Sequence, residues 1–254
     1  MSAPVFLAGP GTLDALGVGD TYLLDGEEGR HAGLVQRRGA GERIDLVDGD
    51  GVRLRTVVEE VSREGLRLRV ESREVEEAPE PALVLVQALA KGDRDELAVE
   101  AATEVGVDVV VPWQAERSVV VWRGDRAAKS QARWRATVRS AVKQSRRARK
   151  PRVEDAVDSR RLVERVREVV AAGGLAVVLH EEASEPVSVA LEAAREAHGE
   201  VLVVVGPEGG ISEREVESLL AAGARAVRLG PHVLRTSTAG PVALGLLAHH
   251  LGRW

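Results

Sequence analysis

Two turns in the sequence combine glycine with charged side chains in a way that suits chemistry on a bound ligand. The first follows the apolar run 201–205 and reads Gly206-Pro207-Glu208-Gly209-Gly210. Its glycines let the backbone approach a ligand and present free amides to it, and Glu208 supplies a carboxylate that could accept a proton. Ser212 and Glu215 have capping-box spacing, which predicts that a helix starts at Ser212.

The second turn follows an expected strand at 226–229 and places an arginine beside hydroxyl groups. Arg235 stands at an expected helix entrance, where a guanidinium suits an anion or a polarised carbonyl. On this stretch alone, an arginine that satisfies local carbonyls explains the residue equally well. With Thr238 as the N-cap, Pro241 falls in the first helical turn, where its missing N–H costs nothing.

A third strand end reads Leu179-His180-Glu181, where a lone histidine is more often structural than catalytic. Familiar motifs are absent: there is no dinucleotide or P-loop fingerprint, no Gly-x-Ser-x-Gly elbow and no His-Glu-x-x-His pattern. The chain has no cysteine, which excludes disulfides, thiolate metal sites and a cysteine nucleophile. We therefore expect no metal.

The composition predicts a globular protein of one large domain or two small ones, with 254 residues, 44% of them hydrophobic and 30% charged. No apolar run is long enough to cross a membrane, and no signal peptide is evident, so a cytoplasmic protein is expected. The net charge is −5, but residues 123–152 hold 12 Lys or Arg and one acid. Such a run is usually a solvated helical face; here it modestly favours a polyanion partner.

The elements that must position these residues fall into two regions. Residues 1–75 alternate apolar and polar residues between turns, as in Arg43–Val47, Val52–Val57 and Leu66–Glu71, which predicts a small antiparallel barrel. The segment 78–81 contains two prolines and is the expected linker.

Residues 82–254 alternate short apolar strands with helices, which predicts an α/β domain with a mostly parallel sheet. Ligands of such sheets bind at the carboxyl ends of the strands, so the three turns described above are expected to converge on one ligand.

Taken together, these residues resemble the 16S ribosomal RNA uracil-N3 methyltransferase family of the SPOUT superfamily. The resemblance is carried by 206–212, by Leu229-Gly230 and by Leu234-Arg235-Thr236-x-Thr238-Ala239. Supporting matches lie at 90–94, 102–107, Pro112, 116–119, 144–147, Pro151, Arg30-His31 and 48–51. The combination is specific and covers nearly the whole chain.

The resemblance implies a PUA-like β-barrel at 1–75 that binds RNA, and a SPOUT α/β domain at 82–254 with a deep trefoil knot. It also implies a homodimer, S-adenosylmethionine as cofactor, and 16S rRNA of the small ribosomal subunit as partner. The implied cofactor residues are Leu179, His180, Glu181, Gly206, Pro207, Glu208, Gly209, Gly210, Leu229, Gly230, Val233, Leu234 and Thr236.

The implied reaction methylates N3 of a uridine, which is a poor nucleophile until its proton leaves. Arg235 is the candidate that stabilises the resulting anion, and Glu208 or water is the candidate proton acceptor. The candidate RNA contacts are Arg30, Arg94, Arg117, Arg139, Arg146 and Arg147.

The sequence departs from the family at Ser237, where the family usually has Glu, and at Gly240-Pro241, where it usually has an alanine-rich helix start. Its N-terminal motif, Arg30-His31-Ala32, also matches less of the corresponding motif in the family. The alternatives are a knotted methyltransferase with another RNA target, a non-catalytic RNA-binding ribosome-assembly factor, and, with least support, an enzyme that binds phosphate on its glycine turn.

Overall fold

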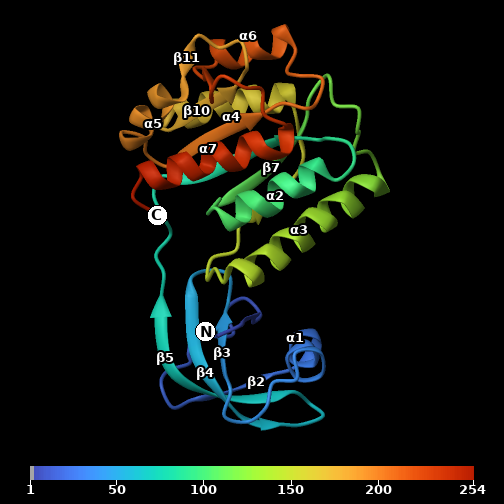
Figure 1. Cartoon of the computed structure of the whole chain (residues 1–254), viewed down its shortest axis with the longest axis vertical. Helices are drawn as coiled ribbons and strands as arrows, with labels where there is room; N and C mark the ends of the chain where they lie inside the picture. Colours follow the sequence, from blue (N-terminus) through green and yellow to red (C-terminus); the bar gives the residue numbers. More distant parts are fainter. Residues whose placement is uncertain (1–2) are drawn as a thin grey trace. The chain divides into compact units, whose positions relative to one another are not determined.

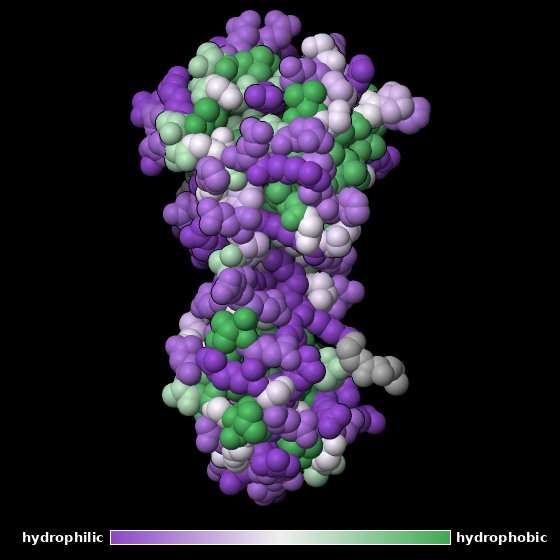
Figure 2. Space-filling model, turned by 90° about the vertical axis from the view of Figure 1, so that its left-hand side faces the viewer, coloured by the Kyte–Doolittle hydropathy of each residue, from purple (hydrophilic) through white to green (hydrophobic). Residues whose placement is uncertain are grey.

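The computed structural model describes residues 3–254, and the first two residues of the expected domain 1–75 lie outside that range. The chain forms two compact units (Figure 1). We call residues up to 78 together with 142–150 the N-terminal unit, and residues 79–141 together with 151–254 the C-terminal unit. On the face drawn in Figure 2, hydrophilic side chains predominate and apolar ones form small groups.

The N-terminal unit is built on a sheet that forms a half-barrel. Its strands are β1 (Val5–Leu7), β2 (Thr21–Leu24), β3 (Arg43–Val47), β4 (Val52–Val61) and β5 (Leu66–Val75), in the order β1-β3-β4-β5-β2. The alternating residues point inward as predicted, and Ile44, Leu54 and Leu68 are fully buried.

The prediction of antiparallel pairing is confirmed for β2 to β5 and is wrong for β1, which runs parallel to β3. The long connection between β1 and β3 permits this, because parallel neighbours need a crossover rather than a hairpin. That connection contains α1 (Gly26–Arg30) and a π-helical turn, η1 (His31–Val35). Neither element was predicted from the sequence.

The segment 142–150, which is separated from the end of β5 by residues 76–141, completes the N-terminal unit. Lys143 Nζ donates to both carboxylate oxygens of Glu28 at 2.9 and 3.1 Å and lies 5.5 Å from the centre of the Phe6 ring. Arg53 donates to the carbonyl of Arg146, and Arg149 donates to the carbonyl of Glu76. These contacts make 142–150 part of this unit.

The C-terminal unit contains the parallel sheet that the sequence predicts. Its strand order is β11-β13-β10-β12-β6-β7-β8, and β9 pairs with β7. The strands are β6 (Ala82–Ala88), β7 (Val109–Gln114), β8 (Arg152–Val153), β9 (Val157–Asp158), β10 (Leu175–Leu179), β11 (Glu185–Pro186), β12 (Glu200–Val205) and β13 (Arg225–Arg228). The two-residue strands β8, β9 and β11 were not predicted, because so short a stretch shows no periodicity.

Helices cover both faces of this sheet. They are α2 (Arg94–Glu104), α4 (Ser159–Ala171), α5 (Val187–Arg195), α6 (Glu213–Ala221) and α7 (Thr236–His250). A further helix, α3 (Asp125–Ser145), begins in this unit, and its last residues, 142–145, belong to the N-terminal unit. Because side chains alternate along a strand, Val84 and Val86 pack with α4 and α6, whereas Leu85 faces α7. In the part of the chain that the structure describes, no helix is both long and apolar enough to span a bilayer.

The predicted start of α7 is wrong. The helix begins at Thr236 with Arg235 as its N-cap, and the amides of Thr238 and Ala239 both donate to the Arg235 carbonyl. Pro241 therefore lies in the second turn, where it cannot donate to the carbonyl four residues earlier. The helix starts early because the Thr236 hydroxyl donates to the Gly206 carbonyl at 2.7 Å, which fixes Thr236 beside the end of β12.

Gly240 allows α7 to approach the sheet closely. A methyl group at this position would lie 2.8 Å from Cδ1 of Leu85 and 3.3 Å from Cγ2 of Val205. Alanine favours a helix by up to about 1 kcal/mol over glycine, but overpacking costs about 1–3 kcal/mol. We expect Gly240→Ala to lower the free energy of unfolding by about 1 kcal/mol, the difference of these two effects, as measured by denaturant unfolding.

Gly245 in the same helix is the matched control. A methyl group there meets only the Trp254 ring at 3.9 Å, an ordinary contact. Gly245→Ala should therefore raise the free energy of unfolding by up to about 1 kcal/mol. Equal effects of the two substitutions would show that close packing at Gly240 does not govern the position of α7.

Candidate functional site

The ends of β10 and β13 and the start of α7 enclose a pocket in the C-terminal unit. Its lining comprises Leu179, His180, Glu181, Arg228, Leu229, Gly230, Pro231, His232, Val233, Leu234 and Ala239. Seven of the expected cofactor residues are in this set: Leu179, His180, Glu181, Leu229, Gly230, Val233 and Leu234. The remaining expected residues, 206–210 and Thr236, are not part of the lining.

Much of the pocket wall is irregular backbone. In the described part of the chain, the amides of Gly230, His232, Val233 and Leu234 donate to no other backbone group. Such N–H groups are available to donate hydrogen bonds to water or to a ligand. The apolar side chains of Leu179, Leu229 and Ala239 lie beside them. The wall can therefore hold a flat, partly polar molecule through backbone hydrogen bonds.

A buried chain of hydrogen bonds links this pocket wall to the glycine turn. Gln87 Nε2, at the end of β6, donates to Thr236 Oγ1 at 2.9 Å, and Thr236 Oγ1 donates to the Gly206 carbonyl at 2.7 Å. Gln87 is fully buried, and its Oε1 has no partner among the described residues. Gln87 was not predicted as a site residue. The available signal was its place as the polar residue within the apolar run 83–89.

Glu208 and Arg94 were expected to act separately, and the structure joins them. Glu208 Oε1 accepts from the Lys91 amide at 3.0 Å and from Arg94 Nη1 at 3.1 Å. These contacts connect the turn after β12 to the turn after β6. Glu208 Oε2 has no hydrogen-bond partner within residues 3–254 and remains an acceptor.

Arg117 and Arg235 are both exposed beside the expected ligand turns. Arg117 follows β7 and donates from Nη1 to the Gly209 carbonyl at 3.3 Å and towards the Ile211 carbonyl at 3.5 Å. Arg235 lies between the pocket residue Leu234 and Thr236, and its guanidinium has no partner within residues 3–254. Arg235 is therefore a cation at this site that is available to a ligand, and so is Arg228, which lines the pocket and is exposed without a partner within residues 3–254.

The other expected RNA contacts lie outside this site. Arg30 is the exposed last residue of α1, and Arg139 is exposed on α3. Arg146 follows α3 in a left-handed conformation with φ of 58°, next to the half-buried Arg147. Among the described residues, no group of three or more side chains could hold a metal ion.

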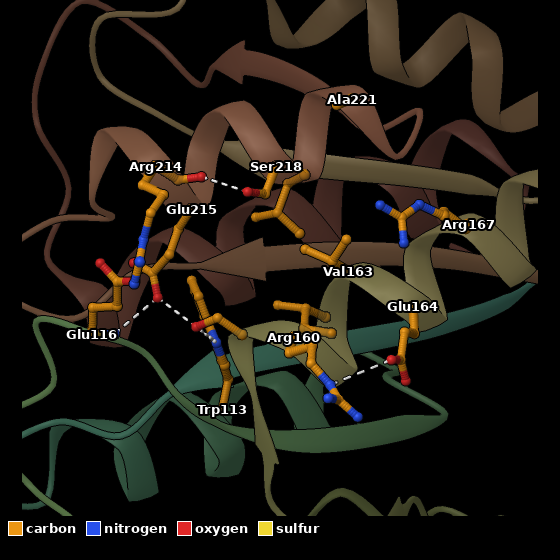
Figure 3. Close-up of a pocket in the computed structure, with 13 residues that line it drawn as sticks. Trp113, Glu116, Arg160, Val163, Glu164, Arg167, Arg214, Glu215, Ser218 and Ala221 are labelled. Carbon is orange, nitrogen blue, oxygen red and sulfur yellow. Dashed lines mark hydrogen bonds and ion pairs between the residues drawn. The ribbon is translucent and has the colours of Figure 1, made fainter.

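A second cavity, of about 530 Å³, lies between α4 and α6 (Figure 3). Its lining contains none of the expected site residues, but it includes Arg214 and Glu215, which follow the glycine turn closely in the chain. Arg214 hydrogen-bonds to the Glu116 carboxylate, as does the Ser212 hydroxyl at 2.7 Å, and these bonds lower the pKa of Glu116. Glu116 is thus held as a carboxylate beside Arg117.

Comparisons with known proteins identify the relatives of this chain. An RNA methyltransferase domain family matches residues 76–248. Ribosomal RNA small subunit methyltransferase E of Mycobacterium bovis is 50% identical over 236 residues, covering 93% of this chain and 89% of that protein. The chain belongs to the ribosomal RNA small subunit methyltransferase E family.

Other members of the methyltransferase E family extend the match. The Bacillus subtilis protein is 32% identical and covers 90% of each chain. The crystal structure of the Neisseria gonorrhoeae methyltransferase E, bound to S-adenosyl methionine, is 28% identical with a TM-score of 0.83 over 98% of each chain. A Legionella pneumophila methyltransferase solved with the same cofactor has a TM-score of 0.81, 28% identity and the same coverage.

In this member of the family, the Thr236 hydroxyl holds the pocket wall against the glycine turn. Thr236→Val keeps the shape but leaves Gln87 Nε2 and the Gly206 carbonyl without their shared partner. Because unpaired buried polar groups cost about 1–3 kcal/mol, we expect a loss of unfolding free energy of that size, measured by denaturant unfolding. The exposed Thr238, on the same turn, is the control, and Thr238→Val should change stability by less than about 0.5 kcal/mol. Equal losses would contradict the role given to Thr236.

Proposed function

We propose that this protein uses S-adenosylmethionine to methylate N3 of a uridine in 16S rRNA of the small ribosomal subunit. The observation that carries the proposal is the pocket at the ends of β10 and β13, whose wall offers unpaired backbone amides in a chain of the methyltransferase E family. Carboxyl ends of parallel strands are where open α/β sheets bind their ligands.

The pocket residues fit S-adenosylmethionine. The free amides of Gly230 and of residues 232–234 suit the edge of an adenine and a carboxylate, and Leu179 and Leu229 supply apolar contact. The turn 206–210 and Thr236 would complete the binding site from the neighbouring strand end. When bound, this cofactor supplies an electrophilic methyl group.

The uracil ring must lose its N3 proton before N3 can act as a nucleophile. Arg235, whose guanidinium is exposed and without a partner in the described chain, would lie against O2 or O4 and stabilise the resulting anion. Glu208 Oε2, or water in the pocket, would accept the proton. Arg94 and the Lys91 amide hold the other oxygen of Glu208 and orient its carboxylate for this role.

The rest of the chain would bind the RNA and complete the assembly. We propose that residues 1–75 form a PUA-like RNA-binding domain, that 82–254 form a knotted SPOUT domain, and that the enzyme is a cytoplasmic homodimer. The RNA contacts would be Arg30, Arg94, Arg117, Arg139, Arg146 and Arg147. Exposed apolar residues on the packed pair α2 and α7, namely Leu97, Val242 and Leu246, support a self-association surface.

The test is methyl transfer from labelled S-adenosylmethionine to purified small ribosomal subunits and to deproteinised 16S rRNA. We expect 3-methyluridine as the product, identified by nucleoside mass spectrometry. Another methylated nucleoside would indicate a different RNA target. Cofactor binding without transfer to any RNA would instead favour a non-catalytic assembly factor.

Arg235→Ala tests the proposed anion stabilisation. Because loss of one such group costs about 10²–10³ in rate, we expect kcat to fall by that factor while affinity for S-adenosylmethionine changes little. Arg225→Ala, at an exposed arginine on β13 outside the pocket, is the control and should leave kcat unchanged. An unchanged kcat for Arg235→Ala would remove Arg235 from the mechanism.

A further inference from the structure

Glu215 is a buried carboxylate that the proposed mechanism does not use. Only 3% of the residue is exposed, although it lies in the first turn of α6 at the edge of the second cavity (Figure 3). Its two oxygens accept hydrogen bonds from the Ser212 amide at 3.0 Å, the Glu116 amide at 2.8 Å and the Ser159 hydroxyl at 2.5 Å.

The three donors come from three separate elements. Ser212 ends the glycine turn after β12, Glu116 follows β7, and Ser159 opens α4. Ser159 also accepts from the indole N–H of Trp113 at 3.2 Å, and this bond connects Ser159 and Glu215 to the buried end of β7. Glu215 thus joins segments that lie nearly 100 residues apart in the chain.

Helix capping accounts for only one of these bonds. In the capping box, the Ser212 hydroxyl accepts a hydrogen bond from the Glu215 amide, and the Glu215 carboxylate accepts one from the Ser212 amide. The bonds from Glu116 and Ser159 add nothing to the cap of α6. They place the loop after β7 at a fixed distance from the glycine turn.

That loop carries Arg117, the residue that reaches across to the glycine turn. Arg117 Nη1 donates to the Gly209 carbonyl, one residue beyond Glu208. The Glu116 side chain accepts from the Ser212 hydroxyl, two residues beyond the end of the same turn. The C-terminal side of the turn is therefore held by the loop after β7, and the backbone of that loop is held by Glu215.

We propose that Glu215 is a positioning residue that sets Arg117 against the glycine turn 206–210, so that the turn binds S-adenosylmethionine and keeps Glu208 in place. This inference rests on the proposed function. Glu215 touches neither substrate nor cofactor in this role; it acts through Arg117 and the turn.

The test is Glu215→Gln, which keeps the size of the side chain but turns one acceptor oxygen into an N–H donor. That group would face the Ser212 amide or the Glu116 amide and lose a hydrogen bond. Misplacement by a remote change can cost up to about a hundredfold. We expect the Kd for S-adenosylmethionine, measured by calorimetry, to rise about tenfold and kcat/KM for RNA to fall by at least as much.

Glu217→Gln is the matched control, because Glu217 is exposed on the same helix and has no partner within residues 3–254. It should leave both quantities unchanged. Ser159→Ala removes one donor from Glu215 without changing its charge, and it should shift both quantities in the same direction by a smaller factor. This variant also serves if Glu215→Gln does not fold.

A double-mutant cycle with Arg117→Ala separates positioning from general destabilisation. If Glu215 acts through Arg117, Glu215→Gln or Ser159→Ala should change the Kd for S-adenosylmethionine much less when Arg117 is already alanine. Equal fold-changes in both backgrounds, or a change no larger than that of Glu217→Gln, would overturn the proposal. Because the Kd needs no RNA, absence of RNA methylation by the unsubstituted protein would count against the proposed function alone.

Discussion

The hydroxyl of Thr236 is the contact on which the candidate site depends. It donates to Gly206 at the end of β12 and accepts from Gln87 at the end of β6, so one side chain sets the start of α7 against two strands. Arg235 is the residue immediately before it, and the pocket wall at 229–234 leads into it. The backbone position of Arg235 is therefore set by a buried hydrogen bond of the neighbouring residue.

Around this contact, carboxylates form several of the hydrogen bonds that connect one strand end to another. Glu208 ties the glycine turn to the turn after β6, and Glu215 and Glu116 tie it to the loop after β7. Strand ends in a parallel sheet carry irregular backbone whose amides need acceptors. Glu208 and Glu215 meet that need here by accepting from the amides of Lys91, Glu116 and Ser212.

The sequence predicted the α/β rhythm and the capping box at Ser212 well, because apolar runs and capping residues act locally. It was wrong about Thr238 as the N-cap of α7, since the true start is set by the distant Gly206. The pairing of Glu208 with Arg94, and the three donors on Glu215, likewise join residues far apart in the chain. No local pattern in the sequence encodes such contacts. The strands β8 and β9, with two residues each, are too short to show the alternation that predicts a strand.

The segment 142–150 has a consequence for the modularity of the chain. It belongs to the N-terminal unit, yet it lies within the stretch of sequence that otherwise builds the parallel sheet. Lys143 is the cation beside Glu28, and Arg149 donates to the Glu76 carbonyl. No single cut can separate the two units without depriving the first of these partners, so the N-terminal unit does not correspond to one contiguous stretch of sequence that could be expressed or exchanged by itself.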